Sequence, residues 1–277
     1  MRFRLIAADL DYTLLDKDSK ISARNKKAIQ NAVYRGLKFT IATGRMFKTS
    51  VAYMNDLELD HDWPIINYHG ALIKTAKSRK TVYHRPMDNK VAVDLIETTH
   101  KMGCHVSLFI GDNLFVREEN EHTRYYQSLT NIELQPVGDL SNFLKQKKAN
   151  PTKMSIISWD GHIDKIEPDL KALFGEKLSI LQSRPYFLEI TDKKATKGQA
   201  LRWLAGRSGI KAEEVIAFGD GYNDLDMISY AGLGVAVANA HPEVLKAARL
   251  VSSSHNEDGV AEVIEKYVLN HDHDSKY

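Results

Sequence analysis

Near its start the chain has a short apolar run, residues 5–8 (Leu-Ile-Ala-Ala). The run ends at two aspartates separated by a single residue, Asp9 and Asp11. An apolar run of this length is typical of a buried strand, and residues two apart in extended backbone point to the same face. The two carboxylates therefore converge, and they repel each other unless a cation or a shared proton compensates. Taken alone, the pair also fits a strand end that turns out to solvent, so its meaning depends on the rest of the chain.

The composition is that of a globular protein and excludes several classes of function. Of 277 residues, 43% are hydrophobic and 27% are charged, and the net charge of +2 predicts no field that attracts nucleic acid or a membrane surface. No run approaches the roughly 18 apolar residues that span a bilayer, and the apolar start of the chain does not resemble a signal peptide. The single cysteine, Cys104, permits no intrachain disulfide, which suits a reducing compartment. We therefore expect a soluble, cytoplasmic protein with no nucleic-acid or membrane partner.

Both ends of the chain alternate between strand and helix patterns. In the first part, Ser22 is placed to cap a helix that ends near Gly36, and strands are predicted at 37–42 and 63–67 with a helix at about 47–57 between them. The last part resumes the pattern, with predicted helices at about 197–207, 223–231 and 259–269 and predicted strands at 215–218, 234–237 and 250–251. This rhythm predicts a parallel sheet with helices on both faces.

The middle of the chain follows a different pattern. One hairpin is predicted around Gly111-Asp112-Asn113 and a second around Ser183-Arg184-Pro185. The other elements predicted there are helices at about 91–102 and 163–174 and a strand at 153–159. Antiparallel pairs with helices beside them indicate an α+β insertion into the parallel domain.

Two domains are therefore predicted. Residues 1–83 and 189–277 form a core of the α/β class with a Rossmann-like parallel sheet, and residues 84–188 form the inserted α+β domain. Residues 271–274 (His-Asp-His-Asp) are of metal-binding types, but a frayed terminus is the expected interpretation.

Polar residues stand at four element boundaries of the predicted parallel domain. These are the aspartate pair, Thr43-Gly44-Arg45, Lys197, and residues 219–224 (Gly-Asp-Gly-Tyr-Asn-Asp). Each group alone fits a turn or a solvated side chain, and the last lacks the ligand spacing of an EF-hand. Ligands of open parallel sheets bind at the carboxyl ends of the strands, so the joint occurrence of these groups predicts one site.

The residue types suit phosphoryl transfer through an aspartyl-phosphate. The carboxylates of Asp9, Asp11, Asp220 and Asp224 are candidate ligands of Mg²⁺, which prefers oxygen, and Asp224 is alternatively an orienting group. Asp9 is the candidate nucleophile, because a carboxylate can form a covalent intermediate. Asp11 is the candidate general acid and base.

The substrate phosphate is expected to contact a second set of residues. Thr43 offers a hydroxyl and Lys197 a point charge at the start of a helix, where the dipole also favours an anion. Gly44, Arg45 and Asn223 are the other candidate substrate contacts. A structural salt bridge is an alternative role for Arg45, and a hydrogen bond to Asp9 is an alternative for Asn223.

These motifs resemble those of the haloacid dehalogenase superfamily, which occur in the same order. Residues 9–15 match the first motif, Thr43 the second, Lys197-Gly198 the third and residues 219–224 the fourth. The insertion resembles the type IIB cap of the Cof-like phosphatases. The resemblance implies a Mg²⁺-dependent hydrolase of small phosphorylated metabolites, often sugar phosphates, whose cap closes over the site and reads the leaving group.

The chain departs from the family pattern at two positions. Tyr12 stands where the family commonly has Gly, and His69 stands in place of a usual Asn. The first change is expected to affect local backbone and the fit of the leaving group, and the second is expected to affect specificity. By the same resemblance the turn at 183–186 is a candidate specificity element, with an ordinary exposed turn as the alternative.

Three other functions remain open at this stage. A phosphomutase uses the same aspartyl chemistry, and a sugar-phosphate sensor is a related protein with weak or lost catalysis. A receiver-type signalling module also groups Asp, Thr and Lys around Mg²⁺, but Asp11 and the large insertion argue against it. The expected partner is a small phosphorylated metabolite, and a homodimer is compatible with the sequence.

Overall fold

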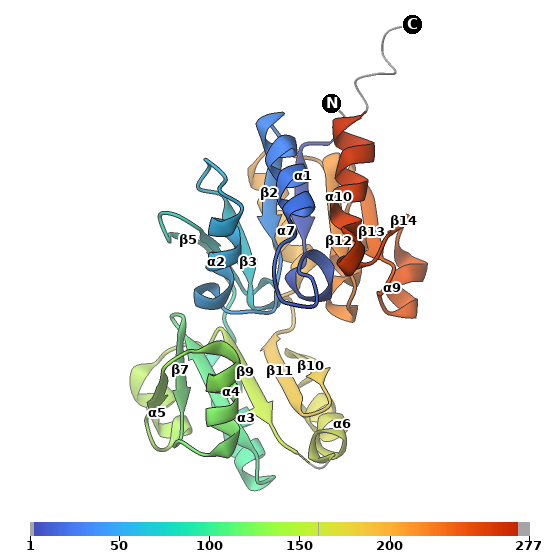
Figure 1. Cartoon of the computed structure of the whole chain (residues 1–277). Helices are drawn as coiled ribbons and strands as arrows, with labels where there is room; N and C mark the ends of the chain where they lie inside the picture. The colour runs from blue at the N-terminus through green and yellow to red at the C-terminus, as the bar shows by residue number, and fades with distance from the viewer. Residues whose placement is uncertain (1–2, 160, 271–277) are drawn as a thin grey trace, which may run out of the picture. The chain divides into compact units, whose positions relative to one another are not determined.

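The structure, a computed structural model, describes residues 3–159 and 161–270, so the sequence 271–274 noted above lies outside the described residues. The chain divides into two compact units, one formed by Met1–Tyr83 with Thr196–Tyr277 and the other by His84–Ala195 (Figure 1). We call them the core unit and the inserted unit. None of the helices within the described ranges is long and apolar enough to cross a membrane.

The second boundary between the units differs from the predicted one. The sequence analysis placed it at 188/189, which lies inside β11 (Phe187–Asp192). This strand pairs on one side with β10 (Leu178–Arg184) and on the other with β9 (Lys153–Ile157). Because both pairings hold β11 in the sheet of the inserted unit, all of β11 belongs to that unit, which ends at Ala195.

The core unit is built on a five-stranded parallel sheet. Its strands, in spatial order, are β14 (Leu250–Ser252), β13 (Leu233–Val237), β12 (Val215–Gly219), β1 (Leu5–Ala8) and β2 (Lys38–Ile41). The central strands β1 and β12 are buried along their whole length, as expected for a parallel sheet covered on both faces. The predicted fold class is confirmed.

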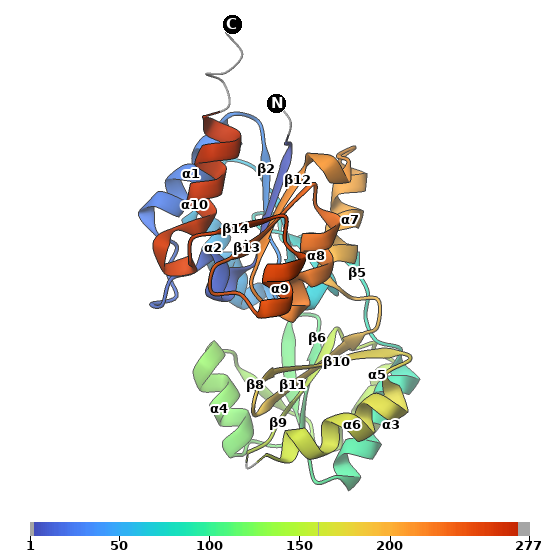
Figure 2. The ribbon, with the colours of Figure 1, turned by 90° about the vertical axis from the view of Figure 1, so that its right-hand side faces the viewer.

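Helices cover both faces of this sheet (Figure 2). One face carries α1 (Ala23–Tyr34) and α10 (Gly259–Ile264), and the other carries α7 (Lys197–Arg207) and α8 (Leu225–Tyr230). The remaining helices are α2 (Phe47–Asp56) and α9 (Pro242–Ala247). Short helical segments are η1 (Leu10–Leu14), η2 (Tyr68–Gly70), η3 (Ala212–Glu214), η4 (Tyr222–Asp224), η5 (His255–Glu257) and η6 (Glu265–Leu269).

The third predicted strand of the core unit runs parallel to the edge of the sheet but pairs with it at one bridge only. β3 (Pro64–Asn67) touches the edge of the sheet through a single bridge, Ala42 with Ile66, and pairs antiparallel with β4 (Leu72–Thr75), which is followed by β5 (Thr81–His84). After β3, left-handed backbone at Tyr68 and His69 (φ +51° and +56°) reverses the chain into β4. The sequence analysis missed β4 and β5.

The inserted unit contains a six-stranded sheet of mostly antiparallel strands. The order is β10, β11, β9, β6 (His105–Ile110), β7 (Asn113–Val116) and β8 (Leu134–Pro136), and only the pair β7–β8 is parallel. Both predicted hairpins, β6–β7 and β10–β11, are present. The sequence analysis did not predict β8.

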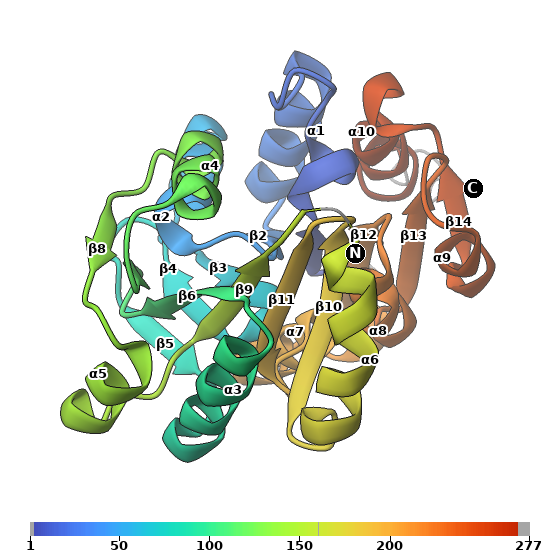
Figure 3. The same ribbon diagram turned by 90° about the horizontal axis from the view of Figure 1, so that it is seen from below.

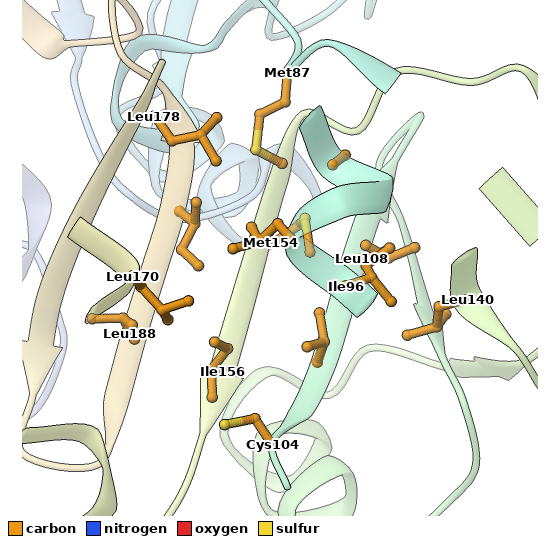
Figure 4. Close-up of a cluster of buried hydrophobic side chains, with 14 of the residues drawn as sticks. Met87, Ile96, Cys104, Leu108, Leu140, Met154, Ile156, Leu170, Leu178 and Leu188 are labelled. Carbon is orange, nitrogen blue, oxygen red and sulfur yellow. The ribbon is translucent and has the colours of Figure 1, made fainter. Parts of the chain in front are cut away.

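Helices pack on this sheet around an apolar cluster. α3 (Asn89–Lys101) and α6 (His162–Phe174) lie over one face (Figure 3), and Met154, Leu108 and Leu188 point from the strands into the cluster (Figure 4). The buried thiol of Cys104 belongs to the same cluster. The other helices are α4 (Glu121–Thr130) and α5 (Leu140–Lys147), neither of which was predicted.

Candidate active site

The carboxyl ends of three adjacent strands bring the predicted site residues together. In the sheet register Ala8 of β1 lies opposite Ile41 of β2 and Phe218 of β12. The chain segments that follow these positions therefore leave the sheet at one edge. Asp9 stays tied to β12 there, because its backbone amide donates to the carbonyl of Phe218 at 3.0 Å.

Lys197 links the first and fourth motifs. It is the first residue of α7, whose N-cap Thr196 accepts a hydrogen bond from the amide of Gln199. The Lys197 ammonium lies 2.7 Å from Oδ1 of Asp9 and 2.6 Å from Oδ1 of Asp224. All three side chains are buried, so one cation compensates two carboxylates in surroundings that contain little water.

Asp224 is held by both of its oxygens. While Oδ1 faces Lys197, Oδ2 accepts hydrogen bonds from the backbone amides of Asp220 (3.1 Å) and Gly221 (3.0 Å). The position before Asp220 must be glycine, because a Cβ on Gly219 would lie 2.4 Å from Cβ of Asp224. Asp224 thus fixes the loop that carries Asp220 and the lysine that faces Asp9.

A cluster of three carboxylates forms the centre of the site. Asp9, Asp220 and Asp224 each offer one oxygen, and the three oxygens lie within 4.8 Å of one another. When all three are ionised, Lys197 compensates only one of the three negative charges. Oxygen donors with excess negative charge fit a hard divalent cation such as Mg²⁺.

Burial raises the pKa of two of these carboxyl groups. The pKa of Asp9 lies well above its usual range because the group is desolvated and faces Asp224 and Asp220, although Lys197 opposes the shift. The pKa of Asp220 is raised to about 6, again by burial and by Asp224, despite the 2.7 Å hydrogen bond that Thr13 Oγ1 donates to it. For Lys197 burial favours the neutral amine, but Asp224 and Asp9 outweigh it and raise the pKa.

Asp11 stands apart from this cluster. Its carboxylate accepts two hydrogen bonds from the Arg45 guanidinium, at 2.9 Å from Nε and 2.5 Å from Nη2. Arg45 also donates to the hydroxyl of Tyr53 at 3.0 Å. The sequence analysis grouped Asp11 with the metal ligands, whereas among the described residues its side chain is paired with Arg45 and is not one of the three clustered carboxylates. The sequence analysis named a structural salt bridge as an alternative role for Arg45, and the pair with Asp11 is such a salt bridge.

The second motif is fixed by the backbone of β3. Thr43 is buried; its amide donates to the carbonyl of Ile66 at 2.9 Å, and its hydroxyl accepts from the amide of Arg45 at 3.1 Å. Beside it, Gly44 faces the ring of His69, which a Cβ at this position would approach to 2.3 Å. The same ring lies 3.4 Å from the amide nitrogen of Asn223.

The sequence analysis gave no role to Thr13 and an incomplete one to Tyr12, two residues near the site. Thr13 lies in the first motif but was given no contact, and only the structure places its hydroxyl on Asp220. Tyr12, between Asp11 and Thr13, adopts left-handed backbone with φ +58°, which explains why glycine suits this position. Its ring is exposed and packs edge-on against His255.

Comparison with known proteins identifies the family. The sequence profile of the haloacid dehalogenase-like hydrolases matches residues 6–264, which is nearly the whole chain. The chain belongs to this family. The resemblance seen in the four motifs is therefore confirmed, and the protein is a hydrolase.

Relatives of this haloacid dehalogenase-like hydrolase match it over almost their full length. A Haemophilus influenzae protein is 33% identical over 271 residues, covering 96% of this chain and 98% of that protein. A Bacillus subtilis protein named as a phosphatase of 5-amino-6-(5-phospho-D-ribitylamino)uracil is 29% identical over 269 residues, with coverages of 95% and 97%. The crystal structure of a haloacid dehalogenase-like hydrolase from Bacteroides thetaiotaomicron superposes with a TM-score of 0.85 at 31% identity, covering 95% of this chain and 99% of that one.

The raised pKa of Asp220 predicts how the stability of this hydrolase depends on pH. A carboxyl group whose pKa rises from 3.8 to about 6 on folding binds its proton more tightly when folded. The favourable contribution of the Asp220 carboxyl group to the free energy of unfolding is fully present below pH 3.8 and is lost as the pH rises through about 6. In the presence of a chelator, the thermal midpoint of the wild type should therefore fall relative to that of Asp220→Asn across this interval.

Added Mg²⁺ should reverse this trend, because a cation that binds the ionised cluster stabilises the folded state. The increase in thermal midpoint should be larger at about pH 7.5 than at about pH 5, where protons compete for Asp220 and Asp9. The same increase at both values, or an equal one in Asp220→Asn, would contradict the assignment of this cluster as a cation site.

Proposed function

We propose that this hydrolase cleaves phosphate monoesters of small metabolites in a Mg²⁺-dependent reaction that passes through an aspartyl-phosphate on Asp9. The observation that carries the proposal is the buried group of Asp9, Lys197, Asp220 and Asp224 at the carboxyl edge of the sheet. A carboxylate nucleophile, a fixed cation beside it and further oxygen ligands are the parts that phosphoryl transfer to a carboxylate requires.

Asp9 is the proposed nucleophile. Its carboxylate attacks phosphorus, the bond from phosphorus to the ester oxygen breaks, and water later hydrolyses the aspartyl-phosphate to release inorganic phosphate. Lys197, whose ammonium lies 2.7 Å from Asp9, is proposed to bind a non-bridging phosphate oxygen, and the buried Thr43 is the proposed hydroxyl donor to another. Asn223 and the backbone of Gly44 are proposed as further phosphate contacts.

A cation held by Asp9, Asp220 and Asp224 would neutralise charge on the phosphoryl group. The fit of these residues to a cation rests on their oxygen donors and on the negative charge that Lys197 leaves uncompensated. Asp224, whose oxygens already bond Lys197 and two amides, is proposed to act mainly by orienting the other groups.

Asp11 is the proposed general acid for the leaving oxygen and the base that then activates water. Arg45 bonds both oxygens of this carboxylate through one lone pair each, so each oxygen keeps a second lone pair that can take the transferred proton. Arg45 is therefore proposed to orient Asp11 for the transfer.

The proposed substrates are phosphorylated polyols and sugars. The motif resemblance implies sugar phosphates, and the named substrate of the Bacillus subtilis relative contains a phosphorylated ribityl chain. A cytoplasmic location and a homodimeric state stay predictions from the sequence, as does the absence of a nucleic-acid partner.

Phosphate release from a panel of phosphorylated metabolites tests this function. We expect release by the purified protein with Mg²⁺, loss of release with excess chelator, and recovery when Mg²⁺ is added back. Release that persists in chelator would contradict the metal dependence. Transfer of the phosphoryl group to a second sugar, with no free phosphate, would indicate the phosphomutase instead.

A further inference from the structure

The turn between β3 and β4 has an unusual backbone. Tyr68 and His69 are consecutive residues in left-handed conformation, at φ +51° and +56°. Few residues other than glycine adopt this conformation, and it is found where the surrounding structure enforces it, often at functional sites. The contacts that hold this turn in place are therefore informative.

The backbone of the turn is bonded to the second motif. The amide of His69 donates to the carbonyl of Thr43, and the amide of Tyr68 donates to the carbonyl of Arg45, both at 3.1 Å. These two bonds lie on either side of Gly44. The turn and the second motif are thus held together as one piece of structure.

The end of the turn packs on the third motif. Gly70 has φ +101°, and a Cβ there would lie only 2.1 Å from the carbonyl oxygen of Thr196. Thr196 is the N-cap of α7, and Lys197 is the first residue of that helix. Only glycine permits this close approach, which places the turn directly against the backbone that carries Lys197.

The His69 side chain extends these contacts to the fourth motif. His69 is buried, and its ring fills the space beside Gly44, where a Cβ would lie 2.3 Å from Cε1. On another side, Nδ1 of the ring lies 3.4 Å from the amide nitrogen of Asn223. An amide nitrogen only donates, so Nδ1 accepts this hydrogen bond and the ring carries its proton on Nε2. One side chain therefore contacts both Gly44 and Asn223, two of the groups proposed to bind phosphate.

The contact with His69 leaves Asn223 able to donate a second hydrogen bond. Its amide nitrogen carries two hydrogens, and its oxygen faces Gly221, where a Cβ would lie 2.5 Å from that oxygen. With one hydrogen directed to His69, the other can donate to a phosphate oxygen. The ring thus fixes the orientation of the amide before a ligand binds, which lowers the cost of ordering it on binding.

We propose that His69 is a positioning residue of the phosphate site, because it orients the Asn223 amide and packs against the backbone of Gly44. This proposal rests on the proposed function, in which both of these groups contact the phosphate. The sequence analysis expected the histidine at this position to affect specificity. Phosphate is the part that all substrates share, so His69 should instead change the affinity for every phosphate ester by the same factor.

Two variants of similar size separate the hydrogen bond from the packing. In His69→Asn, the side-chain oxygen stands close to the position of Nδ1 and still accepts from Asn223, whereas His69→Leu offers no acceptor. We would measure KM and kcat for glycerol 3-phosphate and glucose 6-phosphate, and the inhibition constant of inorganic phosphate. In His69→Leu all three binding constants should rise about tenfold, the effect of one lost hydrogen bond, with little change in kcat. In His69→Asn they should rise less than about threefold.

A double variant tests whether His69 acts through the Asn223 amide. In an Asn223→Ala background, His69→Leu should raise the inhibition constant of phosphate by less than about twofold, because no amide is left to orient. His61→Asn changes an exposed histidine of the core unit and is the matched control, which should alter none of these constants. If the leucine variant is unstable, His69→Gly removes the acceptor while suiting the left-handed backbone. A full tenfold rise in the Asn223→Ala background, or unequal changes in KM for the two esters, would overturn the proposal.

Failure of the proposed function would be recognised separately. If no ester releases phosphate, the hydrolase mechanism fails, and calorimetric binding of inorganic phosphate in the presence of Mg²⁺ then tests the role of His69 alone. Binding that weakens about tenfold in His69→Leu and much less in His69→Asn would support that role. Equal binding by the three proteins, or no binding by the wild type, would overturn it.

Discussion

Asp9→Asn is expected to reduce phosphate release on the order of 10⁴-fold or more, the scale of loss seen when a covalent nucleophile is removed. Asparagine has the same shape and still offers an oxygen to Lys197, which lies 2.7 Å from the carboxylate. It is a poor nucleophile toward phosphorus, and it also removes one of the three clustered carboxylates. The measurement is initial-rate phosphate release at saturating substrate and Mg²⁺.

The control for this variant is Asp18→Asn, which changes an exposed aspartate of the same unit and should leave the rate unaltered. Acid quenching of the reaction with phosphorus-labelled substrate sharpens the test, because the covalent route leaves labelled phosphate on the wild type and none on Asp9→Asn. An Asp9→Asn variant that releases phosphate at the wild-type rate would refute the aspartyl-phosphate mechanism.

Local sequence signals predicted much of the core unit. The helix expected at 197–207 coincides with α7, because its N-cap Thr196 and its apolar spacing are both encoded within the segment itself. The helix after Ser22 begins as predicted, with the serine hydroxyl accepting from the amide of Asn25, and Gly36 beyond its end has φ +93°.

What the sequence did not predict depends on distant contacts. Left-handed backbone at Tyr68 and His69 is unusual for these residue types, and it reverses the chain from β3 into the antiparallel β4. The boundary placed at 188/189 missed that β11 is held along its length by two neighbouring strands.

In the candidate site too, some features follow from local sequence and others depend on distant contacts. Parallel strand ends were enough to expect Asp9, Thr43 and Asp220 at one edge of the sheet. No short-range pattern encodes the pairing of Asp11 with Arg45, which are 34 residues apart, or the bond from Thr13 to Asp220, which are 207 apart. Side-chain partners across such separations are decided by packing.

Lys197→Met is expected to destabilise the folded protein by about 3–5 kcal/mol, the usual cost of removing one partner from a buried ion pair. Methionine fills the volume but leaves Asp9 and Asp224 without the ammonium that lies 2.7 and 2.6 Å from them. The loss in free energy of unfolding should be greatest at neutral pH in the absence of divalent cations. It should shrink in acid, where protonation of the carboxyl groups removes the unpaired charge. Urea unfolding of the metal-free protein measures the effect, and phosphate release should fall at the same time.

Two further variants separate this cause from a general loss of packing. Lys17→Met replaces an exposed lysine of the core unit and should change the free energy of unfolding by only a few tenths of a kcal/mol. In the double variant Lys197→Met with Asp9→Asn, one of the two unpaired charges is gone, so the two changes should cost less together than the sum of the single changes. Additive costs, or a Lys197→Met protein as stable as Lys17→Met, would show that the buried lysine does not compensate these carboxylates. A combined cost below the sum would instead mean that Lys197 both neutralises the carboxylates and supplies the charge proposed to bind phosphate. Stability and activity would then be lost together.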